Sequence, residues 1–263
     1  MDRPSDRIDT RVGWAGFGGD YHHFGRLLYK DLVGKTSFLG FAALAVTGKL
    51  PSNEDVRVLD DIAGCFQCPE PRVWPTKLVR IAASNGRFVP GMIAGWAALV
   101  SGIGSPIAEA AANMLLDLER QVAASSDGEK ALRDFVATKP GLPGFWVYGR
   151  RVDERVAPLR ETIIRHGRSA RPMWSLAEKL WSSMETEHGL TVAIWGGFAA
   201  ALLDLGFAPG DMQPLLSLFF QPSCLAHTIE GAKLKSPGLR EFPLANVKYV
   251  GPPPRVSPRA LGR

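Results

Sequence analysis

The chain has 263 residues, of which 46% are hydrophobic, 9% aromatic and 22% charged. This composition excludes a disordered chain, a collagen-like repeat and a small scaffold held together by disulfides. No apolar stretch reaches the roughly 18 residues of a membrane helix, and the first residues lack the apolar block of a signal peptide. We therefore expect a cytoplasmic protein that does not enter a membrane.

The net charge of +5 comes from the C-terminal segment alone. Residues 235–263 contain six basic side chains and one acidic side chain, so the rest of the chain is neutral. Prolines prevent a helix in a Pro/Arg-rich tail at 252–263, which we interpret as solvated or lying over a partner subunit. Because no helix-turn-helix, zinc-finger or RNA-recognition motif accompanies the charge, we do not expect nucleic-acid binding.

Helical periodicity runs through most of the chain and predicts an all-α protein. In the segment 107–120, for example, apolar residues recur at the spacing of one helix face. Gly and Pro separate the segments, and Val247–Val250 is the kind of short piece that favours a strand. The expected helices are 37–47, 54–65, 76–84, 90–102, 107–120, 128–137, 153–166, 173–186, 192–206 and 211–231.

The cysteines leave three interpretations. Cys65 and Cys68 have the spacing of a redox or zinc motif, and Cys224 with His227 would supply two further zinc ligands. However, the two pairs are far apart in the sequence and both lie in apolar helical segments. Buried thiols are therefore the preferred interpretation, with no metal site, while a zinc site and a redox dithiol remain the alternatives.

A series of short motifs resembles the citrate synthase and citryl-CoA lyase superfamily, in that family's order, over roughly residues 25–252. The helix junction Gly48-Lys-Leu-Pro-Ser-Asn-Glu54 resembles the family's "G-x-L-P-x-x-E". The short length resembles the compact citryl-CoA lyase branch. The other matching segments are Arg80–Ser84, Gly104–Met114, Leu142–Phe145 with Asp153–Arg155, Thr191–Phe207, Leu225–Glu230 and Tyr249–Gly251.

The resemblance implies a citrate-synthase-like helical fold and a homodimer. A large domain would comprise 1–105 and 191–263, and a small domain 106–190. The family's mechanism uses an aspartate that removes a proton next to a CoA thioester, two histidines, and arginines that hold the substrate carboxylates. A CoA thioester would thus be a substrate, and no bound cofactor is expected.

This sequence departs from the family at most of those positions. Ser105 and Pro106 replace the first histidine and its glycine, and the second histidine falls at Trp146 or Val147. Ala193 stands at the aspartate, Phe220 at a carboxylate-binding arginine, and Glu70–Pro71 near an earlier aspartate–histidine pair. Arg155 alone is clearly retained. Because alanine cannot accept a proton, the family's usual mechanism requires substitutes from elsewhere.

The candidate catalytic residues are His188, Glu70 and Ser105. Substrate binding is assigned to Arg155, Arg72, Trp74, Trp195, His227 and Phe220. Each has a structural alternative: Glu70 and Arg72 would form an ion pair in a proline-stiffened connection, and His188 would be a surface helix end. His227 and Glu230, three residues apart, would be a buried structural pair.

Two functions follow from this pattern. The first is a divergent enzyme that forms or cleaves a carbon–carbon bond beside a CoA thioester, or acts on the thioester itself. The alternative is a catalytically inactive shell that binds a ligand or a protein partner. Because charge is lost from the pocket, an apolar or monoanionic ligand is favoured over a dicarboxylate.

The structure can distinguish the two functions. The enzyme would be favoured if one cleft brought together Arg155, Glu70, Arg72 and His188. Their dispersal, with Trp195 and Phe220 filling the cleft, would favour the shell.

Overall fold

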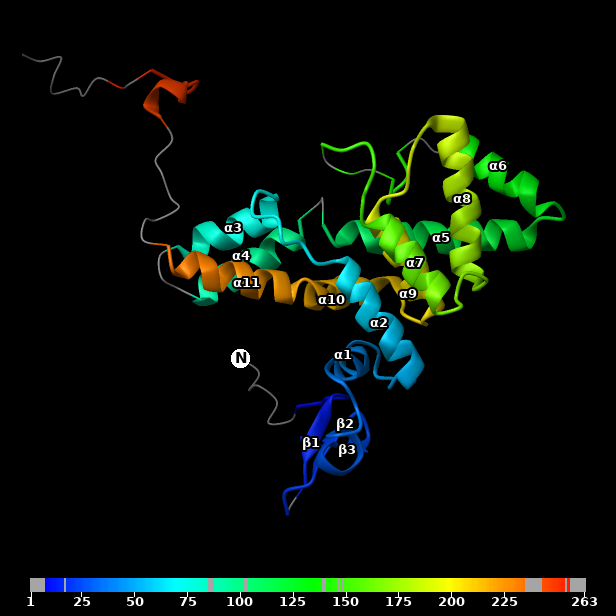
Figure 1. Cartoon of the computed structure of the whole chain (residues 1–263), viewed down its shortest axis with the longest axis horizontal. Helices are drawn as coiled ribbons and strands as arrows, with labels where there is room; N and C mark the ends of the chain where they lie inside the picture. The colour runs from blue at the N-terminus through cyan, green and yellow to red at the C-terminus, as the bar shows by residue number, and fades with distance from the viewer. Residues whose placement is uncertain are drawn as a thin grey trace, which may run out of the picture.

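The computed structural model describes residues 8–16, 18–84, 88–101, 104–138, 141–145, 147, 149–234, 243–253 and 255. They form an all-α fold with a small N-terminal sheet, as Figure 1 shows. The helices are α1 (Phe38–Thr47), α2 (Asn53–Cys65), α3 (Trp74–Ala83), α4 (Phe88–Leu99), α5 (Pro106–Ala124), α6 (Gly128–Thr138), α7 (Val156–Arg165), α8 (Pro172–His188), α9 (Ile194–Asp204), α10 (Pro209–Phe219) and α11 (Gln221–Ala232). Thus the predicted fold class is confirmed.

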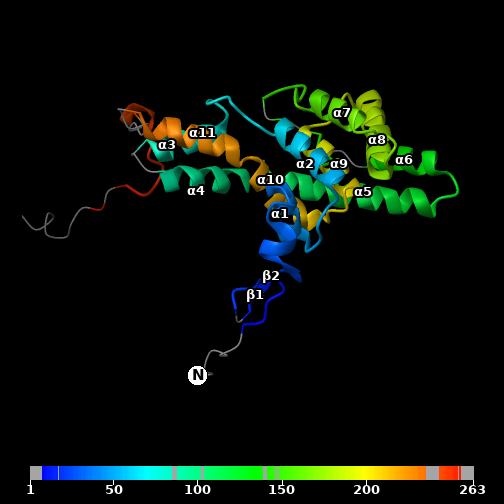
Figure 2. The same ribbon diagram turned by 60° about the horizontal axis from the view of Figure 1, so that its bottom comes forward.

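The N-terminal sheet is a feature that the helical pattern did not predict. Strands β1 (Gly13–Ala15), β2 (Tyr21–His23) and β3 (Arg26–Leu27) pair antiparallel in the order β1-β2-β3. A π-helical turn at Leu28–Leu32 leads toward α1. The hairpin projects away from the helical body (Figures 1 and 2). Conversely, the strand predicted at Val247–Val250 does not form: these residues have no regular secondary structure and pair with no strand of the described residues.

One helix was predicted where two exist. The apolar pattern of 211–231 continues without a gap, but α10 ends at Phe219 and α11 begins at Gln221. Pro222 falls in the first turn of α11, where its missing N–H costs nothing, and it favours a new helix start. Phe220 therefore lies at the corner between two helices.

The helices form two groups joined by α10. Helices α3, α4 and α11 pack side by side at one end, and α10 leads from α11 to the group α5–α9 (Figures 1 and 2). Close packing in the first group depends on glycine. A Cβ at Gly95 of α4 would lie 2.5 Å from Cys224 Sγ and 2.8 Å from Val79 Cγ2. The predicted domain boundaries at 105/106 and 190/191 remain a prediction.

Helix α9 lies at the centre of the hydrophobic core. Its sequence from Ile194 to Leu202 contains no charged residue, and every one of these side chains is buried. The helix packs on both α5 and α8. A helix that is apolar on all sides must be surrounded by other elements, so α9 positions the residues at its N-terminus inside the molecule.

Candidate functional site

The connection between α2 and α3 is fixed to α11 by a hydrogen-bond network. Ser223 Oγ accepts a 2.9 Å hydrogen bond from the Cys68 amide and donates a 2.9 Å bond to Gln67 Oε1. One turn later, His227 Nε2 lies 3.3 Å from the Cys68 carbonyl oxygen, while its buried Nδ1 has no partner in the structure. His227 therefore contacts the backbone of the α2–α3 connection from α11.

The same loop carries the predicted Glu70–Arg72 pair. Arg72 donates to Glu70 through Nε at 2.9 Å and Nη2 at 3.0 Å, and through its backbone amide at 2.9 Å. The side-chain and backbone hydrogen bonds from Arg72 lower the pKa of Glu70 to about 2. Arg72 is 87% exposed, so the pair lies at the surface, as the structural alternative predicted. Trp74, the first residue of α3, is half-buried.

Opposite this loop, the segment before α7 is organised by a buried carboxylate. Asp153 accepts hydrogen bonds from Arg155 Nε and Nη2, both at 2.8 Å, and from the Ile194 amide at 2.8 Å. It therefore caps the N-terminus of α9 and holds the Arg155 guanidinium at once. Burial raises the pKa of Asp153, but Arg155 and the Ile194 amide outweigh it, so this pKa lies below its ordinary value.

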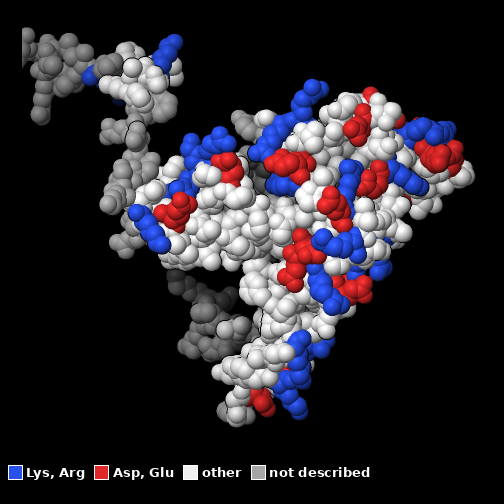
Figure 3. Space-filling view, in the orientation of Figure 1, with Lys and Arg blue, Asp and Glu red and all other residues white. Residues whose placement is uncertain are grey.

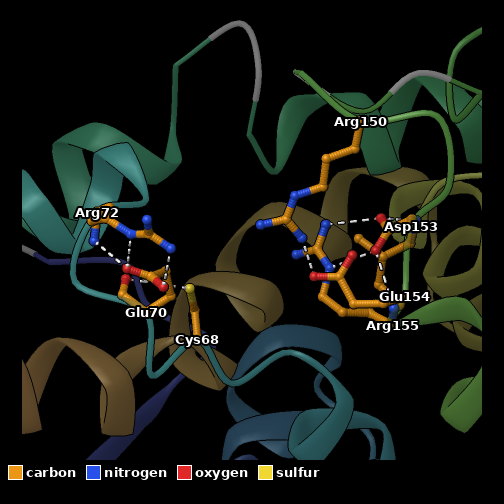
Figure 4. Close-up of polar contacts among 8 residues, drawn as sticks. Cys68, Glu70, Arg72, Arg150, Asp153, Glu154 and Arg155 are labelled. Atoms are coloured by element: carbon orange, nitrogen blue, oxygen red, sulfur yellow. Dashed lines mark hydrogen bonds and ion pairs between the residues drawn. The ribbon is translucent and has the colours of Figure 1, made fainter.

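The two loops face each other across a gap (Figure 4). Arg150 forms an ion pair with Glu154, and its charge also contributes to the low pKa of Glu70 on the other loop. Burial raises the pKa of the Cys68 thiol, while the charges of Arg155 and Arg150 act in the opposite direction. The gap thus has a polar rim of ion pairs: Glu70–Arg72, Arg150–Glu154 and Asp153–Arg155.

An aromatic cluster fills the interior beside these loops. Phe66, at the end of α2, contacts Trp195, Phe198 and Phe220 with ring centroids 5.3, 5.2 and 5.7 Å apart. Trp195 is 8% and Phe220 3% exposed. Ala193, where the resemblance places the proton-accepting aspartate, is fully buried directly before α9. This part of the molecule is therefore closed by apolar side chains.

Two of the predicted catalytic residues, Ser105 and His188, make no contact with these three ion pairs and form hydrogen bonds with backbone carbonyl groups elsewhere. Ser105 is fully buried at the start of α5, where its Oγ donates to the Leu99 carbonyl at 3.3 Å. His188 is the last residue of α8 and points toward α6, with Nε2 3.3 Å from the Val136 carbonyl oxygen. No titratable group is recorded within hydrogen-bond reach of Ser105 in the described part of the chain.

A cavity of about 330 Å³ opens at the N-terminus of α5. It is lined by Pro106, Ile107, Ala110, Gly141, Leu142, Pro143 and Gly144, none of which is charged. Val147, one of the two positions for the family's second histidine, is half-buried and apolar, and Trp146 lies outside the described residues. A cavity with this lining suits an apolar group, and the described residues that line it offer no side-chain counter-charge to a carboxylate.

The structure thus brings some predicted residues together and separates others. Trp195 and Phe220 meet at Phe66, and His227 supports the loop that carries Glu70. The sequence pattern missed Phe66 and the dual role of Asp153. Among the described residues no group of three or more His, Cys, Asp or Glu side chains could hold a metal ion, and none of the helices is long and apolar enough to cross a membrane.

Solved structures with a similar arrangement of helices include those of a citryl-CoA lyase, an ATP citrate lyase and a citrate synthase. The citryl-CoA lyase of Hydrogenobacter thermophilus superimposes with a TM-score of 0.78 at 21% identity, covering 97% of this chain and 99% of that one. The ATP citrate lyase of Methanothrix soehngenii, in complex with citrate and coenzyme A, matches with a TM-score of 0.74 at 16% identity, covering 96% of this chain and 43% of that one. The citrate synthase of Thermoplasma acidophilum matches with a TM-score of 0.64 at 19% identity, covering 86% and 60% of the two chains.

Sequence comparison alone finds no such match. No family model fits the chain, and no curated protein resembles it. The shared arrangement of helices nonetheless covers almost the whole chain. The protein therefore has the helical fold seen in citryl-CoA lyase and citrate synthase.

Proposed function

We propose that this protein is a catalytically inactive, citrate-synthase-like binding protein. The observation that carries the proposal is the aromatic cluster of Phe66, Trp195, Phe198 and Phe220 beside buried Ala193. Ala193 stands where the resemblance expects the proton acceptor, and Phe220 stands where it expects a carboxylate-binding arginine. An apolar interior offers a dicarboxylate no compensation for the water it would lose.

The charged residues around this cluster form ion pairs with one another. Asp153 holds Arg155 in a bidentate ion pair and caps α9, so neither group is available without disrupting the start of that helix. Glu70 has a pKa of about 2, which makes it a weak base at neutral pH. Neither carboxylate therefore substitutes for the missing aspartate.

The ligand that best suits the protein is apolar or monoanionic. The uncharged cavity at the start of α5 would receive its apolar part. Of a CoA thioester, the uncharged acyl and pantetheine portions suit this cavity, whereas its phosphate groups are anionic and would have to lie outside it. The proteins with the same fold include one solved with citrate and coenzyme A.

A divergent acyl-CoA enzyme is the second candidate function. The feature that favours it is the facing pair of loops, where Cys68 and Glu70 lie within electrostatic reach of Arg150. Opening of the Arg150–Glu154 pair would free a guanidinium for a carboxylate or thioester oxygen. Turnover that survives only with Glu70 and Arg150 intact would establish this alternative.

The test is calorimetry of the purified protein with free CoA, acetyl-CoA and citrate. We expect no citrate binding, because Arg150 and Arg155, the described arginines beside this region, are already paired with Glu154 and Asp153. Binding of CoA or acetyl-CoA without citrate would support an acyl-CoA ligand. Citrate binding at low micromolar Kd would overturn the closed-site interpretation.

We also propose that the protein is a cytoplasmic homodimer. Helix α4 contains no charged residue, and Val89, Ile93, Trp96 and Val100 form an exposed apolar stripe along it. Leu225 and Ile229 of α11 are also exposed. A contiguous apolar face of this kind marks an interface, and a second copy of the chain would cover it. By contrast, acidic and basic side chains alternate over α2 and α7 (Figure 3).

A further inference from the structure

The walls of the cavity at the start of α5 are held in place by backbone contacts. Residues 141–144 form one wall, and the Gly144 carbonyl accepts a 2.7 Å hydrogen bond from the amide of Ala193, directly before α9. A Cβ at Gly144 would lie 2.9 Å from the Gly196 Cα, so this wall lies directly against the backbone of α9. Leu142 of the same wall is 8% exposed and packs in the hydrophobic core. The cavity therefore has a defined size before any ligand enters.

The second wall is the beginning of α5. Pro106, Ile107 and Ala110 line the cavity, while Ala108 and Ala111 of the same helix are fully buried and fix its position. The described residues of both walls carry no charge, no aromatic ring and no polar side-chain atom. Such a surface favours an aliphatic group, whereas an aromatic ring would find no ring partner among these residues. The lining therefore indicates an aliphatic ligand.

The volume of the cavity limits how much of a ligand it holds. It measures about 330 Å³. A methylene group occupies roughly the volume of a water molecule in the liquid, about 30 Å³. At the packing density of a protein interior, about three-quarters, the cavity has room for roughly eight carbon atoms. An acetyl group would leave most of this space empty, and a long-chain fatty acyl group would extend out of it into water. An acyl group of intermediate length fits best.

We propose that the cavity binds the aliphatic acyl chain of a medium-chain fatty acid or of its CoA thioester, about eight carbon atoms long. The inference rests on the apolar or monoanionic ligand proposed above and names its class. Both compounds carry the same chain, and both keep their charged groups outside the cavity, in water. Ala110, on the second turn of α5, is exposed and lines the cavity, so its side chain limits the length of chain that fits.

The test is calorimetry of the full-length protein with two ligand series, from acetate to myristate and from acetyl-CoA to myristoyl-CoA, each below its micelle concentration. We expect the affinity to rise about four-fold with each added methylene group and to level off at about eight carbon atoms. Levelling in both series would assign the free acid as a ligand, and levelling in the acyl-CoA series alone would assign the thioester. An affinity that rises through myristate or myristoyl-CoA without levelling would overturn the proposal.

A variant of the cavity wall makes the test specific. Ala110→Leu adds three carbon atoms to the cavity side of α5, at an exposed position where leucine suits a helix. We expect the affinity to level off about three carbon atoms earlier, at about five. Ala123→Leu is the matched control, because it is the same substitution at an exposed position of α5 that does not line the cavity. Its limit should stay at about eight carbon atoms, and an equal limit in both variants would contradict the proposal.

The same titrations separate this inference from the proposed function on which it rests. Absence of binding in both series would refute the apolar ligand of the proposed function and the chain length together. Binding with a length limit that is the same in Ala110→Leu as in the unaltered protein would refute the assignment to this cavity alone. Consumption of acyl-CoA during the titration, followed by chromatography, would refute catalytic inactivity but not the chain length.

Discussion

Replacement of Asp153 by alanine should destabilise the protein more than any exposed charge change. The Asp153 side chain is 1% exposed, caps α9 through the Ile194 amide, and holds Arg155, which is 29% exposed. Loss of a helix cap costs about 1 kcal/mol. Breaking a buried ion pair costs about 3–5 kcal/mol, of which we take about half because Arg155 retains contact with water. We therefore expect the free energy of unfolding to fall by about 3 kcal/mol.

Urea denaturation followed by circular dichroism measures this change, provided that the m-value stays constant. Glu154→Gln is the matched control, because it removes an exposed carboxylate from the neighbouring position. We expect the control to change the free energy of unfolding by less than about 0.5 kcal/mol. An Asp153→Ala variant as stable as the control would refute the role assigned to Asp153.

The remaining predictions concern pH, packing and assembly. Because the folded-state pKa of Asp153 lies below its ordinary value, the stabilisation by this carboxylate is present above the unfolded-state pKa and is lost as the pH falls through the folded-state pKa. Asp153→Asn should therefore flatten the acid limb of the stability profile, below about pH 5, in urea denaturation at a series of pH values. Gly95→Ala should cost about 1–3 kcal/mol in the same assay, because its Cβ would overlap Cys224 and Val79. Gly64→Ala, whose Cβ would meet no atom within 4 Å, is the control and should be neutral or slightly stabilising. Trp96→Glu should convert the dimer to a folded monomer, as measured by light scattering, because it places a charge in the proposed apolar interface on α4. Ile164→Glu, on the exposed surface of α7, is the control and should leave the dimer intact. A Trp96→Glu protein that is still a dimer would exclude the α4 face as the interface.

The amphipathic helices were predictable because their apolar residues recur at the spacing of one helix face, as in α5. The start of α2 is also marked in the sequence by Ser52, whose Oγ caps the helix by accepting from the Asp55 amide at 3.1 Å. The hairpin was not predictable by the same reasoning. Its strands are two or three residues long, too short to show an alternating pattern. Likewise, apolar residues on both sides of Phe220 concealed the corner between α10 and α11.

The candidate site was predictable only in part, because its contacts join distant residues. The substitutions at Ala193 and Phe220 are visible in the sequence, and they already indicated a less polar pocket. That Phe66 closes this region against Trp195 is a tertiary contact without a local signal. The capping of α9 by Asp153 spans 41 residues. In the sequence, Asp153 and Arg155 were visible only as part of a motif that resembles the family, and their ion pair was not predicted.

The most direct test of the closed site is an assay of the purified protein with citryl-CoA, in which release of acetyl-CoA is followed by chromatography. The citryl-CoA lyase of Hydrogenobacter thermophilus, which shares the fold, serves as the positive control. We expect no acetyl-CoA above the buffer blank at enzyme concentrations where the control consumes all of the substrate. Turnover by this protein that disappears in Arg155→Ala, with the fold intact, would contradict the proposal that its reaction centre is closed.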